Sequence, residues 1–197
     1  MPNISNEIAI CIDCWTNLEP PEHLFVKNTI EFINNRSKIG TVILASYQIG
    51  SEHYHNSLWY SNYHTIFNND LPVPELWTHH AFTAKTRYEP WHPWDTEQHT
   101  EPTLLNYKFD NQFQIAMRYW YELEYYLKLH PNIDTIWIFG CSLEYCCKDR
   151  YLGYKWLKKL SNLRILSNSN CICDPHTFNS EYGWKQIDDT IYEYLPN

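Results

Sequence analysis

The stretch "EIAICID" (7–13) is a short apolar run that ends in an aspartate, and it predicts a buried strand. The segment that follows, 18–38, has prolines near its start and apolar residues near helical spacing, which predicts a helix. Gly40 ends this helix, and "TVILASY" (41–47) predicts a second buried strand. A strand, a helix and a strand within about forty residues indicate a right-handed βαβ unit.

The rest of the chain continues this alternation. Further strands are predicted at 103–109, 134–140 and 163–169, and further helices at 111–130, 144–160 and 180–195. "CICD" (171–174) predicts an edge strand or a turn. We therefore expect an α/β fold, a three-layer α/β/α arrangement around a doubly wound, mostly parallel sheet of Rossmann-like topology.

A single domain is expected to span 1–197, with a lid-like excursion at about 48–103. The excursion is irregular and rich in His, Trp, Tyr and Pro, and we expect one short helix in it. Structureless insertions of this length are uncommon unless they form a lid or a binding wall. Substrate specificity is therefore expected to lie in this segment.

Composition and charge exclude several classes of protein. Of the 197 residues, 44% are hydrophobic and 19% are charged, which is typical of a folded domain. The net charge of −8 argues against nucleic acid as a partner, because phosphate contacts need a basic surface. No apolar run has the length of a transmembrane helix, and the N-terminal stretch lacks the basic region of a signal peptide. We expect no membrane partner and a cytoplasmic location.

The seven cysteines leave two interpretations open. Without an export signal, the simpler one is reduced thiols in a cytosolic protein. The other is a structural zinc site, for which the ligands would be Cys11, Cys14, Cys171 and Cys173. Cys11 and Cys14 lie three residues apart on a predicted strand, so their side chains are expected to point to opposite faces.

Two polar residues are predicted to meet at one edge of the sheet. In doubly wound sheets, ligands bind beyond the carboxyl ends of the strands, where the strand order reverses. In the order 3-2-1-4-5, the strand that ends at Gly140 lies beside the strand that ends at Asp13. Cys146 would then fall in the first turn of a helix, where the dipole and the free N–H groups favour a thiolate. The alternative is that Asp13 caps a loop and Cys146 packs in the core.

The residues at these two strand ends resemble a known family, the isochorismatase-like cysteine hydrolases, which include nicotinamidases. The resemblance lies in "IAICID" (8–13) and "GCSLEYCC" (140–147). The family's signature after its fourth strand is G-V-x-T-D-Y-C-V, and the matches in identity or charge are Gly140, Glu144, Tyr145 and Cys146. The family also has a lysine followed by a phenylalanine; here Lys108, with Phe113 behind it, stands 38 residues before Cys146. The resemblance covers most of the chain outside 48–103.

The resemblance implies a catalytic triad of Asp13, Lys108 and Cys146. Cys146 would attack a carbonyl carbon to give a thioacyl intermediate, and Asp13 would carry the thiol proton to the leaving amine. Lys108 would hold the aspartate in its charged form. A non-proline cis peptide would map to Cys141–Ser142, and the N–H groups of Ser142 and Cys146 would form an oxyanion hole.

This chain also departs from the family pattern. Leu143 stands where the family usually has threonine, which removes a hydroxyl group beside the nucleophile. The family's metal-binding Asp-x-His corresponds here to Gln48 and Gly50, so no metal or other cofactor is expected. His53 and His55 are the weaker candidates for a displaced divalent metal such as zinc.

The expected function is that of a cysteine hydrolase that cleaves the C–N (amide) bond of a small-molecule substrate through a thioacyl intermediate. The alternative is a catalytically inactive module on the same fold that binds a small ligand or a partner. The Leu143 substitution and the missing metal ligands keep this alternative open. The oligomeric state stays open too, because apolar lid surface could serve a homo-oligomer as readily as a ligand.

Overall fold

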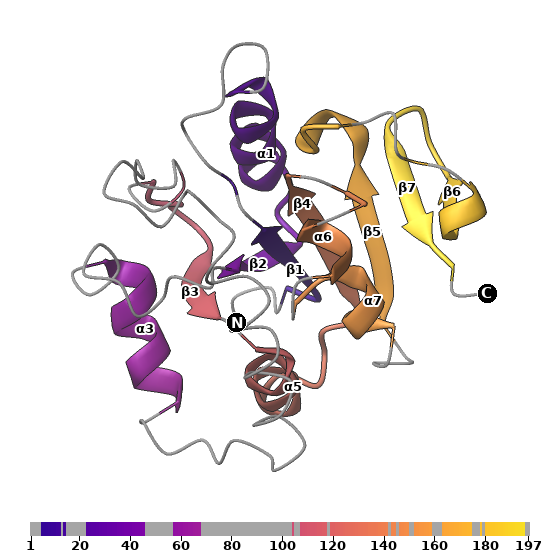
Figure 1. Cartoon of the computed structure of the whole chain (residues 1–197). Helices are drawn as coiled ribbons and strands as arrows, with labels where there is room; N and C mark the ends of the chain where they lie inside the picture. Colours follow the sequence, from indigo (N-terminus) through magenta and orange to yellow (C-terminus); the bar gives the residue numbers. More distant parts are fainter. Residues whose placement is uncertain are drawn as a thin grey trace, which may run out of the picture.

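The computed structural model describes residues 5–12, 14, 23–45, 57–67, 104, 107–117, 119–141, 143–144, 146–149, 152–158, 163–174, 178 and 180–195. A seven-stranded sheet in the order β3-β2-β1-β4-β5-β7-β6 forms the centre of the molecule (Figure 1). The strands are β1 (Glu7–Ile12), β2 (Ile39–Ala45), β3 (Phe113–Met117), β4 (Thr135–Gly140), β5 (Arg164–Asn168), β6 (Trp184–Gln186) and β7 (Ile191–Tyr194). The helices are α1 (His23–Asn35), α3 (Leu58–Phe67), α5 (Trp120–Leu129), α6 (Cys146–Asp149) and α7 (Tyr154–Leu157), with short 3-10 helices η3 (Ser169–Cys171) and η5 (Ser180–Tyr182).

The first five strands are parallel and have the order 3-2-1-4-5, the arrangement in which Asp13 and Cys146 are expected to meet. Every residue of β1 and β4 is buried, because both strands lie inside the sheet with side chains packed on both faces. The near-continuous apolar runs in their sequences are typical of strands that are buried on both faces of a sheet. An α/β architecture with a mostly parallel sheet is thereby confirmed, and it is compatible with the expected three layers.

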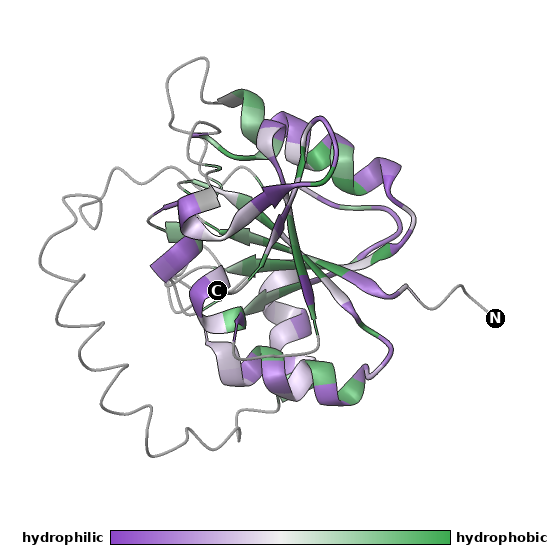
Figure 2. Ribbon diagram, turned by 90° about the vertical axis from the view of Figure 1, so that its right-hand side faces the viewer, coloured by the Kyte–Doolittle hydropathy of each residue, from purple (hydrophilic) through white to green (hydrophobic). Residues whose placement is uncertain are grey.

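Alternate residues of the strands supply two apolar layers on opposite faces of the sheet. The layer on the α1 face joins α1 to the strands through Ala9, Cys11, Phe25, Val26, Ile33, Trp137 and Phe139. The layer on the opposite face, here called the α5–α7 face, includes Ile8, Ile10, Leu123, Tyr126, Ile136, Ile138, Cys147 and Leu157. Figure 2 shows the apolar strands between helices on these two sides.

The third strand lies later in the chain than predicted. The prediction placed it at 103–109, but β3 begins at Phe113, and α5 begins at Trp120 rather than at 111. The side chain of buried Gln114 explains part of the difference. It hydrogen-bonds the backbone on either side of Lys108, so this stretch lies beside β3 instead of joining the ladder. The buried positions of "FQIAM" are more apolar than "TLLNYKF", and burial favours the later segment.

The C-terminal helix predicted at 180–195 is wrong, because the segment forms an antiparallel hairpin of β6 and β7. Gly183 has a φ of +83°, a backbone conformation that favours glycine and interrupts a helix. Asp188 accepts the N–H of Asp189 in the turn between the strands. Trp184 is buried against Tyr154, with ring centroids 5.3 Å apart, and this contact holds the hairpin on the α5–α7 face.

The helix predicted at 144–160 is divided into α6 and α7. Gly153 lies between them in extended conformation. A Cβ atom at Gly153 would lie only 2.6 Å from the carbonyl oxygen of Cys147, so the chain returns closely onto α6. A continuous helix cannot make this contact. The short helix expected within 48–103 is α3, and the remainder of that excursion lies outside the described residues.

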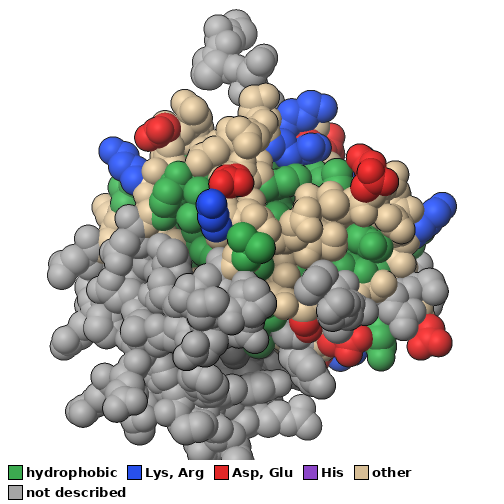
Figure 3. Space-filling model, turned by 90° about the horizontal axis from the view of Figure 1, so that it is seen from above, with side chains coloured by type: hydrophobic (Ala, Val, Ile, Leu, Met, Phe, Trp, Pro, Cys, Tyr) green, Lys and Arg blue, Asp and Glu red, His purple; other side chains and the backbone are tan. Residues whose placement is uncertain are grey.

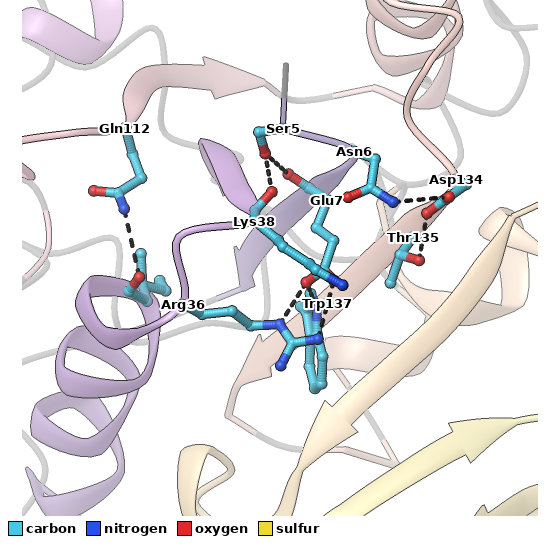
Figure 4. A network of polar contacts seen from close by, with 10 residues as sticks. Ser5, Asn6, Glu7, Arg36, Lys38, Gln112, Asp134, Thr135 and Trp137 are labelled. Carbon is cyan, nitrogen blue, oxygen red and sulfur yellow. Dashed lines mark hydrogen bonds and ion pairs between the residues drawn. The ribbon is translucent and has the colours of Figure 1, made fainter. Parts of the chain in front are cut away.

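A polar network lies at the edge of the sheet where the parallel strands β1 and β4 begin (Figure 4). The buried carboxylate of Glu7 accepts hydrogen bonds from Arg36 (Nη2, 3.0 Å) and from the indole N–H of Trp137 (2.7 Å). The guanidinium of Arg36 also lies 4.5 Å from the ring centroid of Trp137. Ser5 donates to the carbonyl oxygen of Lys38 beside this cluster. The network joins the end of α1 to β1 and β4, at the edge opposite to the ends of the parallel strands.

The described surface mixes charges of both signs. On the face shown in Figure 3, acidic and basic side chains alternate with apolar ones, and the side chains described there form no continuous basic stretch. Among the helices that the structure describes, none is long and apolar enough to cross a membrane.

Candidate functional site

The carboxyl ends of β1 and β4 meet at the point where the strand order reverses. Gly140 ends β4 with a φ of +138°, and a Cβ atom there would lie 1.8 Å from the carbonyl oxygen of Ile12. The N–H of Cys141 donates to this same oxygen, at 3.2 Å. The two strands therefore approach as closely as glycine permits. The ends of the two strands lie side by side, in the position where doubly wound sheets bind ligands.

Cys146 begins α6 at this edge and is partly exposed. All seven cysteines are among the described residues, and of the five free ones only Cys146 is not buried. The neighbouring Cys147 is fully buried, with its sulfur 3.9 Å from the carbonyl oxygen of Phe139. Because α6 has only four residues, its dipole offers less support to a thiolate than the long helix of the prediction.

The other free thiols have structural surroundings. Burial raises the pKa of Cys171 to about 12, and the neighbouring Cys14 adds to the shift. Its thiol is therefore protonated and unreactive at neutral pH. Cys11 and Cys14 both belong to the layer on the α1 face. The expectation that they point to opposite faces is wrong, because β1 ends at Ile12 and Cys14 lies beyond the strand.

Cys141 and Cys173 form a disulfide, with Cα atoms 5.1 Å apart. The expectation of seven reduced thiols is therefore wrong for this pair. The zinc site that would have used Cys173 is wrong as well, since its sulfur is already bonded. The described residues contain no group of three or more His, Cys, Asp or Glu side chains that could hold a metal ion.

The disulfide is one of several links between the segment after β4 and the segment after β5. Gly140 forms an isolated parallel bridge with Ile172, and its carbonyl oxygen accepts the N–H of Cys173 at 3.2 Å. The carboxylate of Asp174 accepts the N–H of Leu143 at 2.9 Å. Residues 171–174, predicted as an edge strand or a turn, leave η3 and make this bridge.

Asp174 is a site residue that the sequence reasoning missed. The available signal was an acidic residue a few positions after the fifth predicted strand, at the same edge as Asp13 and Cys146. Its carboxylate accepts the N–H of Leu143. Leu143 itself is fully buried in the layer on the α5–α7 face.

Lys108 lies at the outer edge of β3. The carbonyl oxygen of Tyr107 accepts from Gln114 at 2.8 Å, and the N–H of Phe109 donates to Gln114 at 2.9 Å. Since β3 is three strands away from β4, the usual strand spacing separates them by about 14 Å. Phe109 packs on the α1 face, whereas Cys146 packs on the α5–α7 face. These contacts place the neighbours of Lys108 beside β3, and the approach of Lys108 to Cys146 stays a prediction.

The remaining predicted positions lie outside the described residues. They are Asp13, Ser142, His53, His55, Gln48 and Gly50. The cis peptide, the oxyanion hole, the base and the histidine metal site stay predictions. Ile12, which precedes Asp13 in the chain, is paired with Gly140 in the sheet register.

Comparisons with protein families, with curated proteins and with solved structures found no match to this chain.

Proposed function

We propose that this protein is a cysteine hydrolase of the isochorismatase-like type, which cleaves the C–N bond of a small amide with Cys146 as nucleophile. The observation that carries the proposal is the position of this thiol. It is the accessible one of the five free thiols, and it follows β4 at the point where the strand order reverses. The other four free thiols are buried.

The chemistry needs one nucleophile and one proton carrier. The sulfur of Cys146 forms a bond to the carbonyl carbon while its proton passes to Asp13, and the C–N bond then breaks as Asp13 protonates the leaving nitrogen. Water next attacks the thioacyl carbon and gives a proton to Asp13. The C–S bond breaks, the acid is released, and the proton returns to the thiolate. The scheme gives Lys108 no role, because the residues on either side of it bond to Gln114 beside β3, three strands from β4.

The alternative function, a module on the same scaffold that binds a ligand without cleaving it, is favoured by one observation. The residues on either side of Lys108 bond to Gln114 beside β3, three strands from β4, which argues against this lysine as the charged partner of the nucleophile. Leu143 also lacks the hydroxyl group of the family's threonine.

Two experiments test the proposal. The first is timed carbamidomethylation of the native protein by iodoacetamide below pH 8, read by mass spectrometry at each cysteine. We expect Cys146 to be modified at least tenfold faster than buried Cys171, because a nucleophilic thiol reacts as its thiolate. Equal rates at both cysteines would contradict the assignment of Cys146 as the nucleophile. The alternative function, a module that binds a ligand without cleaving it, would then stand.

The second experiment is turnover of a panel of small amides by wild type, Cys146→Ser and Lys108→Ala proteins. Turnover should fall by at least about a thousandfold in Cys146→Ser, because the hydroxyl group is the weaker nucleophile. Lys108→Ala should keep wild-type turnover. A loss in Lys108→Ala as large as that in Cys146→Ser would restore the family triad and overturn the mechanism proposed above.

A further inference from the structure

The segment from Gly140 to Cys147 carries the proposed nucleophile, and the segment from Cys171 to Asp174 holds it in place. Four links join the two segments: the Gly140–Ile172 bridge, the hydrogen bond from Cys173 to Gly140, the disulfide, and the hydrogen bond from Leu143 to Asp174. The first three act at the end of β4. Of these links between described residues, the fourth acts further along the chain, at Leu143 on the way to α6.

We propose that Asp174 is a positioning residue, whose carboxylate holds the Leu143 N–H and thereby places the Cys146 thiol. This inference rests on the proposed function. Leu143 stands three residues before Cys146, and both pack against the same apolar layer. The turn is thus held from two sides, by burial of the Leu143 side chain and by the acceptor on its backbone.

The chemistry of the pair explains why an aspartate stands there. Leu143 is completely buried, and a buried N–H without an acceptor is costly. A carboxylate makes a stronger acceptor than a neutral group. The disulfide at Cys173 fixes the residue immediately before Asp174, which limits where the carboxylate can lie. Loss of the acceptor should loosen the turn while the disulfide and the backbone bridge keep the two segments together.

The test uses the full chain without reductant and compares Asp174→Ala with Asp174→Asn. Asparagine keeps an oxygen at the acceptor position and removes the charge, whereas alanine removes the acceptor. Asp189→Ala is the matched control, an exposed aspartate in the turn between β6 and β7. Two quantities are measured in each protein: amide hydrogen exchange at Leu143 by NMR, and the rate of carbamidomethylation at Cys146.

In Asp174→Ala we expect exchange at Leu143 to become at least tenfold faster and modification of Cys146 at least fivefold slower. Asp174→Asn should recover both to within about threefold, since it still accepts the hydrogen bond. The control should match the wild type. Recovery by asparagine but not alanine is a result that a general loss of packing would not produce.

Unchanged exchange and unchanged labelling in Asp174→Ala would overturn the inference. If that variant does not fold, hydrogen exchange in the wild-type protein is the test. A Leu143 amide that exchanges there as fast as an unstructured amide also overturns the inference. Failure of the proposed function is distinguishable. Slow labelling of Cys146 in the wild type rejects the nucleophile, while the exchange data still show whether Asp174 holds the turn.

Discussion

Gly140 ends β4 in a backbone conformation that other residues adopt only under strain, with a φ of +138°. The missing side chain also leaves space for the carbonyl oxygen of Ile12, which accepts the N–H of Cys141. The close approach of β1 and β4, and hence the start of the segment that carries Cys146, depends on this single residue.

Gly140→Ala is expected to lower the free energy of unfolding by about 3 kcal/mol or more, through strain at positive φ together with the contact on Ile12. Urea denaturation measures the change. Gly40→Ala is the control, because a Cβ atom there would meet Ser5, with the Cβ atom of Ser5 at 2.5 Å, but the residue carries no strain at positive φ, so its cost should be smaller. Equal costs in the two variants would contradict this role for Gly140.

Asp134 makes a contribution to the stability of the fold that depends on pH. Hydrogen bonds from Thr135 and Asn6 hold the pKa of this carboxyl below its ordinary value of 3.8. A depressed pKa stabilises the fold above the unfolded value, and the contribution is lost as the pH falls through the folded value. On acidification from pH 5 to below pH 3, wild type should therefore lose more stability than Asp134→Asn, as measured by urea midpoints. Asn6→Ala should give part of the same effect, and parallel curves for all three proteins would contradict it.

At the scale of elements, α1 is joined to the sheet in two ways. Its apolar side chains pack on the α1 face, and Arg36, just beyond the helix, binds the buried carboxylate of Glu7. The hairpin of β6 and β7 is held by aromatic packing around Trp184. Both contacts join segments that are distant in sequence.

Arg36→Ala is expected to lower the free energy of unfolding by about 2 kcal/mol, because it leaves the Glu7 carboxylate buried without its cation. The side chain of Glu7 is 6% exposed, whereas in the exposed pair Lys27–Glu31 both side chains are more than half exposed. Lys27→Ala should consequently cost less than about 0.5 kcal/mol. Denaturant unfolding of the two variants side by side measures the difference, and similar costs would contradict a structural role for the Glu7 network.

At the scale of the whole molecule, the disulfide joins two of the sheet's connections across 32 residues of sequence. Closing a loop of that length stabilises a fold by roughly 3 to 4 kcal/mol, chiefly by restricting the unfolded chain. Six of the seven cysteines lie beyond the ends of β1, β4 and β5, and only Cys11 lies within a strand.

The thiol count tests this arrangement. Denatured protein without reductant should take up five equivalents of a thiol reagent, and reduced protein seven. The native protein should take up one equivalent of the reagent quickly, at Cys146. Mass spectrometry of the labelled protein measures all three counts. Seven equivalents before reduction would exclude the Cys141–Cys173 bond. The double variant Cys141→Ser/Cys173→Ser then serves as the reference protein that cannot form this disulfide.

The sequence by itself determined the elements that depend on local pattern. The apolar runs of β1, β2, β4 and β5 and the amphipathic α1 were found within a few residues, because burial imposes a regular spacing on the chain. The order 3-2-1-4-5, considered from the sequence as one arrangement among those that connection rules allow, is the one observed. The same pattern placed Cys146 shortly after the end of a central strand, and the family resemblance singled it out as the candidate nucleophile.

Only the tertiary structure decided the features that depend on contacts between distant segments. The side chain of Gln114 binds the backbone on both sides of Lys108, so this stretch lies beside β3 and not in the ladder. The pairing of Cys141 with Cys173 and the bond from Leu143 to Asp174 follow from the meeting of two loops at one edge. No local pattern contains these contacts, because the energy of each depends on a partner that the fold brings near.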